Sequence, residues 1–261
     1  MSMQTDLVLV SAQNGVVTLT LNRPDQYNAL SEEMLEALDS ELNRISQDKT
    51  VKCVIITGAG KAFCAGHDLK QMRSNPQREY YEDLFARCAK VMQAIVNLPV
   101  PVIAKVNGMA TAAGCQLVAS CDLAMAGDSA KFAVSGINVG LFCSTPAVAL
   151  TRNMPIKKAF EMLVTGNFIS AAEAAVYGLI NKVVPTSNLD RAVQELADTI
   201  CSKSTVAVRT GKSMYKQQMG MSLPDAYDYA GKIMANNMMA QDACEGIDAF
   251  IEKRQPKWTG N

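Results

Sequence analysis

The sequence is poor in histidine and tryptophan, with one of each among 261 residues. A zinc site usually takes several ligands from histidine and cysteine side chains. The eight cysteines lie mostly within apolar runs, and no two of them form a CxxC pair. We therefore expect no structural metal, and we expect the cysteines to be reduced residues of the protein interior.

An excess of charge of either sign is also lacking, because Lys and Arg together number 25 and so do Asp and Glu. A balanced chain has no long-range field that attracts a polyanion, so we expect no nucleic-acid partner. No apolar run reaches the ~18 residues of a membrane-spanning helix, so no membrane span is expected. Residues 1–6 lack the basic and apolar pattern of a targeting segment, which favours a cytoplasmic protein.

What the sequence does contain is enough apolar material for a large core, since 49% of its residues are hydrophobic. Asn14-Gly15 is a turn signal between two extended runs, and residues 35–45 place leucine and isoleucine on one face of a helix that begins after Ser31. Strands are predicted at residues 7–10, 16–21, 51–57, 102–106 and 180–184. The alternation favours an α/β fold built of strand, strand and helix units.

Helices dominate after residue 155. One of them begins with the capping box Ser170-Ala171-Ala172-Glu173, in which the serine and glutamate side chains satisfy free backbone N–H groups. Beyond Pro185, helical segments are predicted at residues 187–203, 204–219, 222–239 and 242–254. No linker rich in glycine and serine separates this tail from the rest. We expect the tail to pack on the core or on a neighbouring subunit.

Two loops with glycines follow predicted strands, at residues 58–70 (GAGKAFCAGHDLK) and 107–116 (NGMATAAGCQ). Neither has the spacing of a Walker loop or of a complete dinucleotide-binding motif. Small residues after a strand allow a ligand to approach backbone N–H groups, above all where a helix begins and its dipole adds positive potential. The same residues also suit tight turns between packed layers, and both interpretations stand at this point.

The order of motifs along nearly the whole chain resembles the crotonase, or enoyl-CoA hydratase/isomerase, superfamily. The motifs are the two loops, residues 22–24 (NRP), 27–30 (YNAL) and 245–254 (EGIDAFIEKR). Residues 66–70, 112–122 and 139–146 are most similar to the enoyl-CoA hydratase domain-containing protein 3 subgroup. The resemblance implies a ClpP-like spiral of ββα repeats over residues 1–200 and a helical oligomerisation region over 201–261. It also implies a homotrimer or a dimer of trimers.

The resemblance further implies an acyl-CoA ligand, with no cofactor beyond the CoA thioester itself. Matched by position, the backbone N–H groups of His67 and Ala113 form an oxyanion hole for the thioester carbonyl. Two preorganised donors of this kind stabilise an enolate-like oxygen. The residues implied in CoA binding are Lys61, Ala65, Gly66, Asp68, Leu69, Lys70 and Lys253, together with Met234 contributed by a neighbouring subunit.

The chain departs from the family pattern at the two carboxylates that a hydratase uses to activate water and deliver a proton. Their positions match Gln116 and Gly136, so hydration by paired glutamates is disfavoured. Glutamates introduced at both positions are expected to raise hydration. Ser135-Gly136 also resembles the dihydroxynaphthoyl-CoA synthase variants, in which a bound anion occupies the space of the missing carboxylate, although Val134 stands where those variants have a polar residue.

Other polar residues have alternative interpretations. The His67 imidazole titrates near neutrality and could act as an acid or base, but the resemblance assigns the role to its backbone N–H. Asp68 is expected to cap a helix. Asn138, Ser144 and Thr145 could polarise a water or satisfy local backbone groups. Three functions stay open: an acyl-CoA enzyme that uses an enolate, a catalytically silent acyl-CoA binder or sensor, and a purely structural oligomer module.

Overall fold

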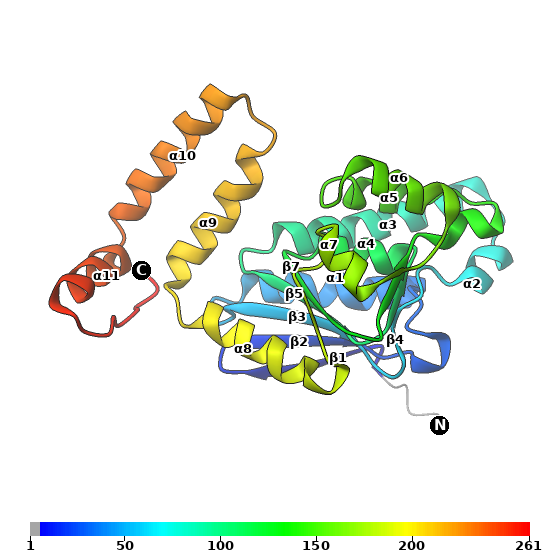
Figure 1. Ribbon diagram of the computed structural model, residues 1–261, viewed down its shortest axis with the longest axis horizontal. Coiled ribbons are helices and arrows are strands. Elements are labelled where there is room, and N and C mark those ends of the chain that lie inside the picture. The colour runs from blue at the N-terminus through cyan, green and yellow to red at the C-terminus, as the bar shows by residue number, and fades with distance from the viewer. Residues whose placement is uncertain (1–5) are drawn as a thin grey trace.

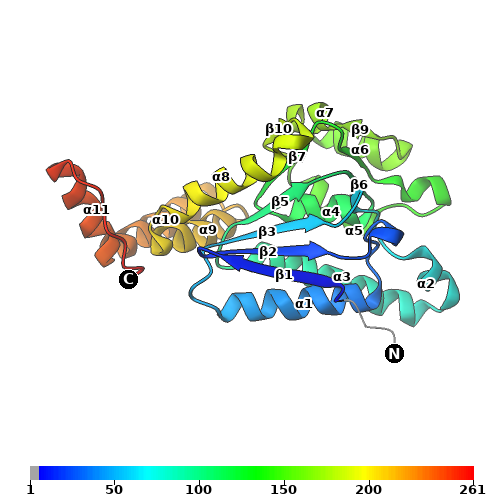
Figure 2. The same ribbon diagram turned by 90° about the horizontal axis from the view of Figure 1, so that it is seen from below.

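The computed structural model describes residues 6–261, and its strands form two sheets (Figures 1 and 2). The larger sheet has six strands in the order β1-β2-β3-β5-β7-β10, and the smaller has four in the order β4-β6-β8-β9. All neighbouring pairs are parallel except β1 with β2 and β8 with β9. The pairs β3–β4, β5–β6 and β7–β8 each give one strand to each sheet before a helix follows. The predicted spiral of ββα repeats is therefore confirmed.

The strands of the larger sheet are β1 Val8–Gln13, β2 Val16–Leu21, β3 Cys53–Gly58, β5 Val102–Val106, β7 Leu123–Gly127 and β10 Lys182–Val184. Those of the smaller sheet are β4 Ala62–Cys64, β6 Met109–Thr111, β8 Lys131–Ala133 and β9 Ile169–Ser170. Strand β3 is buried along its whole length. It is continuously apolar because a parallel strand inside an α/β fold is covered on both faces.

The helices that accompany the sheets are α1 Glu32–Gln47, α2 Leu69–Ser74, α3 Arg78–Asn97, α4 Ala113–Ser120, α5 Ser144–Leu150, α6 Ile156–Thr165, α7 Ala171–Val176 and α8 Leu189–Cys201. Three short 3-10 helices are η1 Pro24–Gln26, η2 Ser135–Val139 and η3 Thr186–Asn188. Ser31 is the N-cap of helix α1, and its hydroxyl accepts the Met34 N–H. The helix buries its predicted apolar face. The capping box of α7 is present as predicted.

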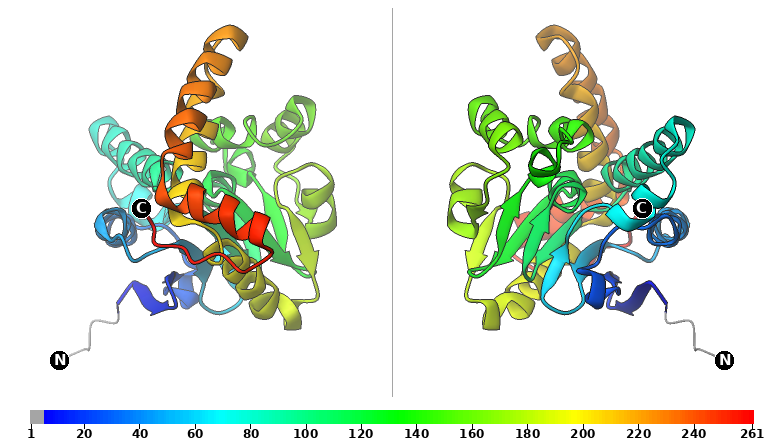
Figure 3. Two further views of the ribbon diagram at one scale, coloured as in Figure 1. Left: turned by 90° about the vertical axis from the view of Figure 1, so that its left-hand side faces the viewer. Right: turned by 90° about the vertical axis from the view of Figure 1, so that its right-hand side faces the viewer.

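The last three helices, α9 Thr205–Gln218, α10 Leu223–Met238 and α11 Gln241–Glu252, form an extension that projects from the sheets (Figures 1 and 3). No residue of α9 or α10 is buried. Asp122, at the start of β7, joins the extension to the core through ion pairs with Lys212 and Lys216 of α9, at 2.6 and 2.7 Å. The division of the chain at residues 200 and 201 stays a prediction.

Two further observations bear on the expectations from composition. Six of the eight cysteines are buried, Cys201 is half-buried and Cys244 is exposed, and all are free thiols. Over residues 6–261, no helix combines the length and the apolar character needed to cross a membrane.

Candidate functional site

The two glycine-containing loops touch each other at the ends of β4 and β6. A Cβ atom added at Gly66 would lie 2.8 Å from the Ala112 Cβ and 3.2 Å from the Ala113 N. A Cβ atom at Gly114 would lie 2.1 Å from the Cys64 carbonyl oxygen. Gly114 needs glycine because backbone meets backbone there, and Gly66 because it combines close packing with a φ of +92°. The contact places His67, the neighbour of Gly66, beside the first turn of α4.

The direction of the His67 backbone is set by one isolated bridge to Leu30. This parallel bridge uses the Leu30 N–H, which donates to the Gly66 carbonyl at 2.8 Å, and the Asp68 N–H, which donates to the Leu30 carbonyl at 3.3 Å. In a parallel bridge the central residue turns its own N–H and C=O to the other side. The His67 N–H therefore points away from the Leu30 segment.

A strained residue precedes the second N–H group. Ala112 has φ +50° and ψ −121°, close to the first central residue of a type II′ turn, which places a non-glycine residue at positive φ. Such conformations cost about 1–3 kcal/mol and persist where the surrounding structure holds them. The turn orients the peptide that carries the Ala113 N–H, at the first position of α4. The dipole of the helix adds partial positive charge there.

Both N–H groups are without an acceptor in the part of the chain that the structure describes. Within residues 6–261, neither the His67 N–H nor the Ala113 N–H donates a hydrogen bond to another protein group. The first N–H groups of a helix have no partner inside the helix, and a ligand oxygen can satisfy them. The arrangement is suited to holding an oxygen atom that carries partial or full negative charge.

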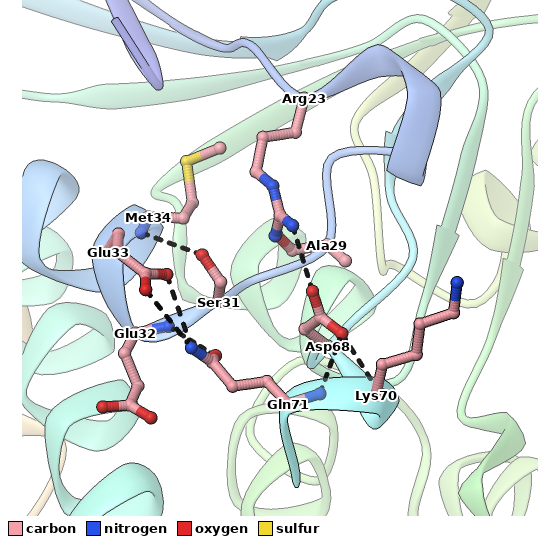
Figure 4. A network of polar contacts seen from close by, with 9 residues as sticks. All are labelled: Arg23, Ala29, Ser31, Glu32, Glu33, Met34, Asp68, Lys70 and Gln71. Atoms are coloured by element: carbon pink, nitrogen blue, oxygen red, sulfur yellow. Dashed lines mark hydrogen bonds and ion pairs between the residues drawn. The ribbon is translucent and has the colours of Figure 1, made fainter. Parts of the chain in front are cut away.

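A polar network fixes the His67 loop against the segment before α1 (Figure 4). The Arg23 guanidinium donates to the Ala29 carbonyl at 2.9 Å and to the Asp68 carboxylate at 3.0 Å. Asp68 also accepts the N–H groups of Lys70 and Gln71, which confirms it as the cap of α2. Burial raises the pKa of Asp68, but the hydrogen bonds, led by that from Arg23, outweigh it and hold the pKa below its usual value.

Asn28 extends this network into the interior. Its side chain is fully buried, accepts the Arg23 N–H at 2.9 Å and donates to the carbonyls of Ala62 and Phe63. The sequence interpretation did not assign roles to Arg23 or Asn28. The motifs at residues 22–24 and 27–30 contain both residues and were the signal from which a role could have been inferred. The structure supplies the reason, because a buried asparagine needs several fixed hydrogen-bond partners.

The His67 side chain is held in an apolar setting. Among residues 6–261 neither buried ring nitrogen has a hydrogen-bond partner, and the ring meets Phe85 edge to face at 5.5 Å between centroids. Burial lowers the pKa of His67 to about 4. The imidazole is therefore neutral near pH 7, and this environment does not favour it as the source of a proton at that pH.

Gln116 lies on α4, one turn after Ala113. Its side chain is buried, and its Oε1 atom has no hydrogen-bond partner among residues 6–261. A carboxamide does not exchange protons near neutral pH, so Gln116 contributes only hydrogen bonds to the chemistry of this region.

Gly136 lies in η2, where there is no room for a side chain. A Cβ atom would lie 2.5 Å from the Leu141 carbonyl oxygen and 2.8 Å from the Cys143 sulfur. A glutamate at this position would have to displace the backbone of Leu141, so the expected gain in hydration from glutamates at 116 and 136 stays a prediction that requires this backbone to move. The alternative of a bound anion beside Gly136 is not favoured either. The Leu141 carbonyl oxygen is an acceptor, and burial raises the pKa of the Cys143 thiol, so neither group is a good partner for an anion.

The remaining polar candidates mostly bond to nearby protein groups. The Ser135 hydroxyl lies 2.7 Å from that of Thr111, the Ser144 hydroxyl donates to the Phe142 carbonyl at 3.4 Å, and the Asn138 amide donates to the Gly166 carbonyl at 3.4 Å. The Ser144 contact agrees with the interpretation that this residue satisfies a local backbone group, whereas Asn138 bonds to a backbone group 28 residues away.

The structure brings together only part of the predicted CoA-binding set. Ala65, Gly66, Asp68, Leu69 and Lys70 follow one another through the His67 loop into α2, and Leu69 is 55% exposed. The Lys70 side chain extends away from the network of Figure 4. Lys61, just before β4, is exposed.

Met234 and Lys253 are not beside this loop in the single chain. Met234 is 71% exposed on α10, and Lys253 ends α11. Figures 1 and 2 show α11 and α2 at opposite ends of the molecule.

Comparisons with known proteins show which family this chain resembles over its length. A family model described as enoyl-CoA hydratase/isomerase matches residues 11–261. The enoyl-CoA hydratase domain-containing protein 3, mitochondrial, of Xenopus laevis is 46% identical over 98% of this chain and 87% of its own length. The crystal structure of the human enoyl coenzyme A hydratase domain-containing protein 3 is 45% identical, with a TM-score of 0.94 over 97% of this chain and all of that one.

A crystal structure of an enoyl-CoA hydratase from Mycobacterium smegmatis is also similar, at 56% identity, with a TM-score of 0.95 over 97% of this chain and 98% of that one.

One expectation is corrected by these findings. The cytoplasmic assignment rested on the missing targeting pattern at residues 1–6, but similar curated proteins from Xenopus laevis, rat and human are named mitochondrial. A targeting segment is chemically separate from the residues that build the fold. The folded part of a sequence is therefore a poor guide to its compartment.

Proposed function

The chain belongs to the enoyl-CoA hydratase/isomerase family, and from this premise we propose that it binds acyl-CoA thioesters and holds the thioester carbonyl oxygen between the N–H groups of His67 and Ala113. The observation that carries the proposal is that these two groups, on loops in direct contact, make no hydrogen bond within residues 6–261. Donors that are fixed before the ligand arrives need no reorganisation when charge develops on the oxygen.

The chemistry proposed for this pair is stabilisation of a thioester enolate. An enolate carries negative charge on the thioester oxygen, whether it forms by transfer of the neighbouring proton to a base or by cleavage of the neighbouring C–C bond. One preorganised donor is worth about 3 kcal/mol at such an oxygen. The fixed direction of His67 and the turn at Ala112 supply the preorganisation.

The proposal excludes the usual pair of hydratase carboxylates. Gln116 and Gly136 match their positions, and neither residue can transfer a proton. The reaction is therefore of a kind that needs an enolate but not two carboxylates, such as thioester isomerisation, C–C cleavage or hydrolysis. The same two residues favour a second candidate, a catalytically silent acyl-CoA binder or sensor.

The CoA moiety is proposed to run along residues 65–69, with Lys61 and Lys70 near its phosphates. Met234 and Lys253 would serve the site of a neighbouring subunit in a trimer or a dimer of trimers. This assembly is supported by the extension, whose large apolar side chains are exposed in the single chain; Leu223 is 72%, Met239 83% and Phe250 84% exposed. Exposed apolar patches of this kind usually mark an interface.

The proposed hole is tested by removing one donor. Ala113 is the first residue of α4, where proline removes no helical hydrogen bond, so Ala113→Pro deletes the N–H donor; circular dichroism first checks that the turn at Ala112 tolerates the ring. We expect Ala113→Pro to weaken the binding of acetoacetyl-CoA, an enolisable thioester, by about 100-fold in calorimetric titration. Binding of a thioether analogue without the carbonyl should change little.

Arg78→Pro is the matched control, because Arg78 is the exposed first residue of α3 and its N–H donates to no described acceptor. This variant should bind both probes as the unmodified chain does. An Ala113→Pro protein that folds and binds acetoacetyl-CoA unchanged would contradict the proposal. A turnover screen over acyl-CoAs of varied length and oxidation state separates the enzyme from the silent binder.

A further inference from the structure

We propose that Arg23 is a positioning residue of the oxyanion hole, because its guanidinium group fixes the place and direction of the His67 N–H. This inference rests on the proposed function, since it concerns how one of the two donors is held before a ligand arrives. Arg23 is assigned no contact with the ligand and no proton transfer. It acts through the backbone of the His67 loop.

The first observation is the position of the two acceptors of the guanidinium relative to the bridge that pairs Leu30 with His67. The carbonyl of Ala29, the residue before Leu30, accepts a hydrogen bond from Arg23 Nη1 at 2.9 Å. The carboxylate of Asp68, the residue after His67, accepts one from Nη2 at 3.0 Å. Figure 4 shows the Arg23 side chain directed toward both residues. The guanidinium therefore joins the two paired segments immediately beside the bridge.

The second observation is that the bridge itself is uneven. Its bond before His67, from the Leu30 N–H to the Gly66 carbonyl, is 2.8 Å long, whereas its bond after His67, from the Asp68 N–H to the Leu30 carbonyl, is 3.3 Å long. A longer hydrogen bond is a weaker constraint. Arg23 binds the loop on the side of this weaker bond, where an additional contact has the greatest effect on the direction of the His67 peptide.

The third observation separates positioning from attachment. The segment before α1 is attached to the loop without the guanidinium, because the Ala65 N–H donates to the Tyr27 carbonyl at 3.0 Å and the Asn28 amide donates to the Ala62 carbonyl at 2.8 Å. Both contacts reach the loop before His67. Loss of the Arg23 side chain should therefore leave the segment in place and loosen the part of the loop that follows the donor.

The chemistry of the guanidinium suits this role. The group is planar, stays charged near neutral pH and presents its N–H groups in a rigid fork. The two bonds use separate nitrogens, so the spacing between Ala29 and Asp68 is set by a fixed group. The pair with Asp68 is charge-assisted, and the two side chains are only 18% and 17% exposed, which limits competition from water. A lysine at this position would keep the charge but not the fork.

The test measures the ratio of two affinities by calorimetric titration, one for acetoacetyl-CoA and one for a thioether analogue that lacks the thioester carbonyl. Arg23→Ala should weaken the binding of acetoacetyl-CoA by about 10-fold, because a displaced donor loses much of its effect, and should change the binding of the thioether little. A low concentration of guanidinium chloride should restore part of the lost affinity. Sodium chloride at the same ionic strength should not, and a role in stability alone predicts neither result.

Arg44→Ala is the matched control, because the Arg44 guanidinium also pairs with a carboxylate, that of Glu41, but on the exposed side of α1. This variant should bind both probes as the unmodified chain does. Asp68→Asn provides a second variant in case Arg23→Ala does not fold, since asparagine also caps helices and only the charged partner is lost. It should lower the same ratio, and combining it with Arg23→Ala should lower the ratio little further.

Three results would overturn the inference. A folded Arg23→Ala protein that keeps the ratio of the unmodified chain would do so, and the proposed function would stand. Equal weakening of both probes would show a general structural role for Arg23 and would also leave the proposed function standing. Equal binding of both probes by the unmodified chain would overturn the proposed hole together with the inference.

Discussion

The core of this chain buries its apolar side chains, whereas the helical extension leaves most of its apolar side chains exposed. In the core, apolar side chains of the inner strands of the larger sheet and of the packed helix faces are fully buried, as at Leu19, Ile56 and Leu38. In the extension, α9 and α10 bury no residue at all. The core buries its apolar surface through contacts within the chain, whereas the apolar surface of the extension is left exposed in the single chain, as the proposed assembly would require. Glycines in the two regions should therefore respond differently to the same substitution.

The largest effect is expected at Gly114. In Gly114→Ala the new methyl group would lie 2.1 Å from the Cys64 carbonyl oxygen, so the two loops must separate. Overpacking against backbone should lower the free energy of unfolding by about 3 kcal/mol. Denaturant unfolding measures this, and titration with acetoacetyl-CoA should show weakened binding in the same variant. Unchanged stability would mean that the loops are not in contact.

The joint between the two regions should give the next largest effect. Asp122→Asn leaves Lys212, whose side chain is 8% exposed, without its carboxylate partner. An unpaired cation in such a position should cost about 2–3 kcal/mol of stability. Limited proteolysis between α8 and α9 should become faster.

Asp190→Asn is the matched control for Asp122→Asn. It breaks the pair with Lys105, in which the Asp190 side chain is 87% exposed, and such pairs contribute little. Equal proteolysis of both variants would show that Asp122 does not join the extension to the core.

A smaller effect concerns acid stability, because the only histidine of the chain belongs to the core. Burial lowers the pKa of His67 from 6.5 to about 4, so below pH 6.5 the unfolded chain binds a proton that the folded chain does not. The contribution is fully present above pH 6.5 and is lost as the pH falls toward 4. Between pH 7 and pH 5 the loss should be about 2 kcal/mol. His67→Phe should remove this part of the pH dependence in denaturant titrations.

The smallest effect is expected in the extension. Gly231 lies inside α10, and a Cβ atom added there has no neighbour within 4 Å. Gly231→Ala should raise the free energy of unfolding by about 0.5–1 kcal/mol, because alanine loses less backbone entropy in a helix. A decrease instead would show that Gly231 is packed against another subunit, and would place the α10 surface inside an assembly.

The sequence allowed the long elements to be predicted and the short ones not. Strands β2 and β5 have the bounds expected from their apolar pattern. Strands β4, β6, β8 and β9 are two or three residues long, which is too short for a period of two to be recognised. Yet two of these strands carry the loops of the site. Their existence depends on pairing between distant segments, such as Ala110 with Phe132, and not on local preference.

The site shows the same division. Local chemistry identified the Asp68 cap, because the capped N–H groups lie two and three residues away. The partner of Asp68, Arg23, lies 45 residues earlier and required the fold. The closure of the space at Gly136 could not be predicted either, since the Leu141 carbonyl approaches through the path of η2. The two loops could be located in the sequence, but the atoms that surround them could be identified only from the structure.

The bridge between Leu30 and His67 should make the backbone amide of His67 behave differently in solution from those of Leu30 and Asp68. Deuterium should replace the hydrogens on Leu30 and Asp68 slowly, since both are engaged with protein carbonyls. The backbone amide hydrogen of His67 should exchange quickly until a ligand oxygen accepts it. The exchange rate of the His67 amide would thus report whether a ligand is bound, and the amides of Leu30 and Asp68 would serve as internal references.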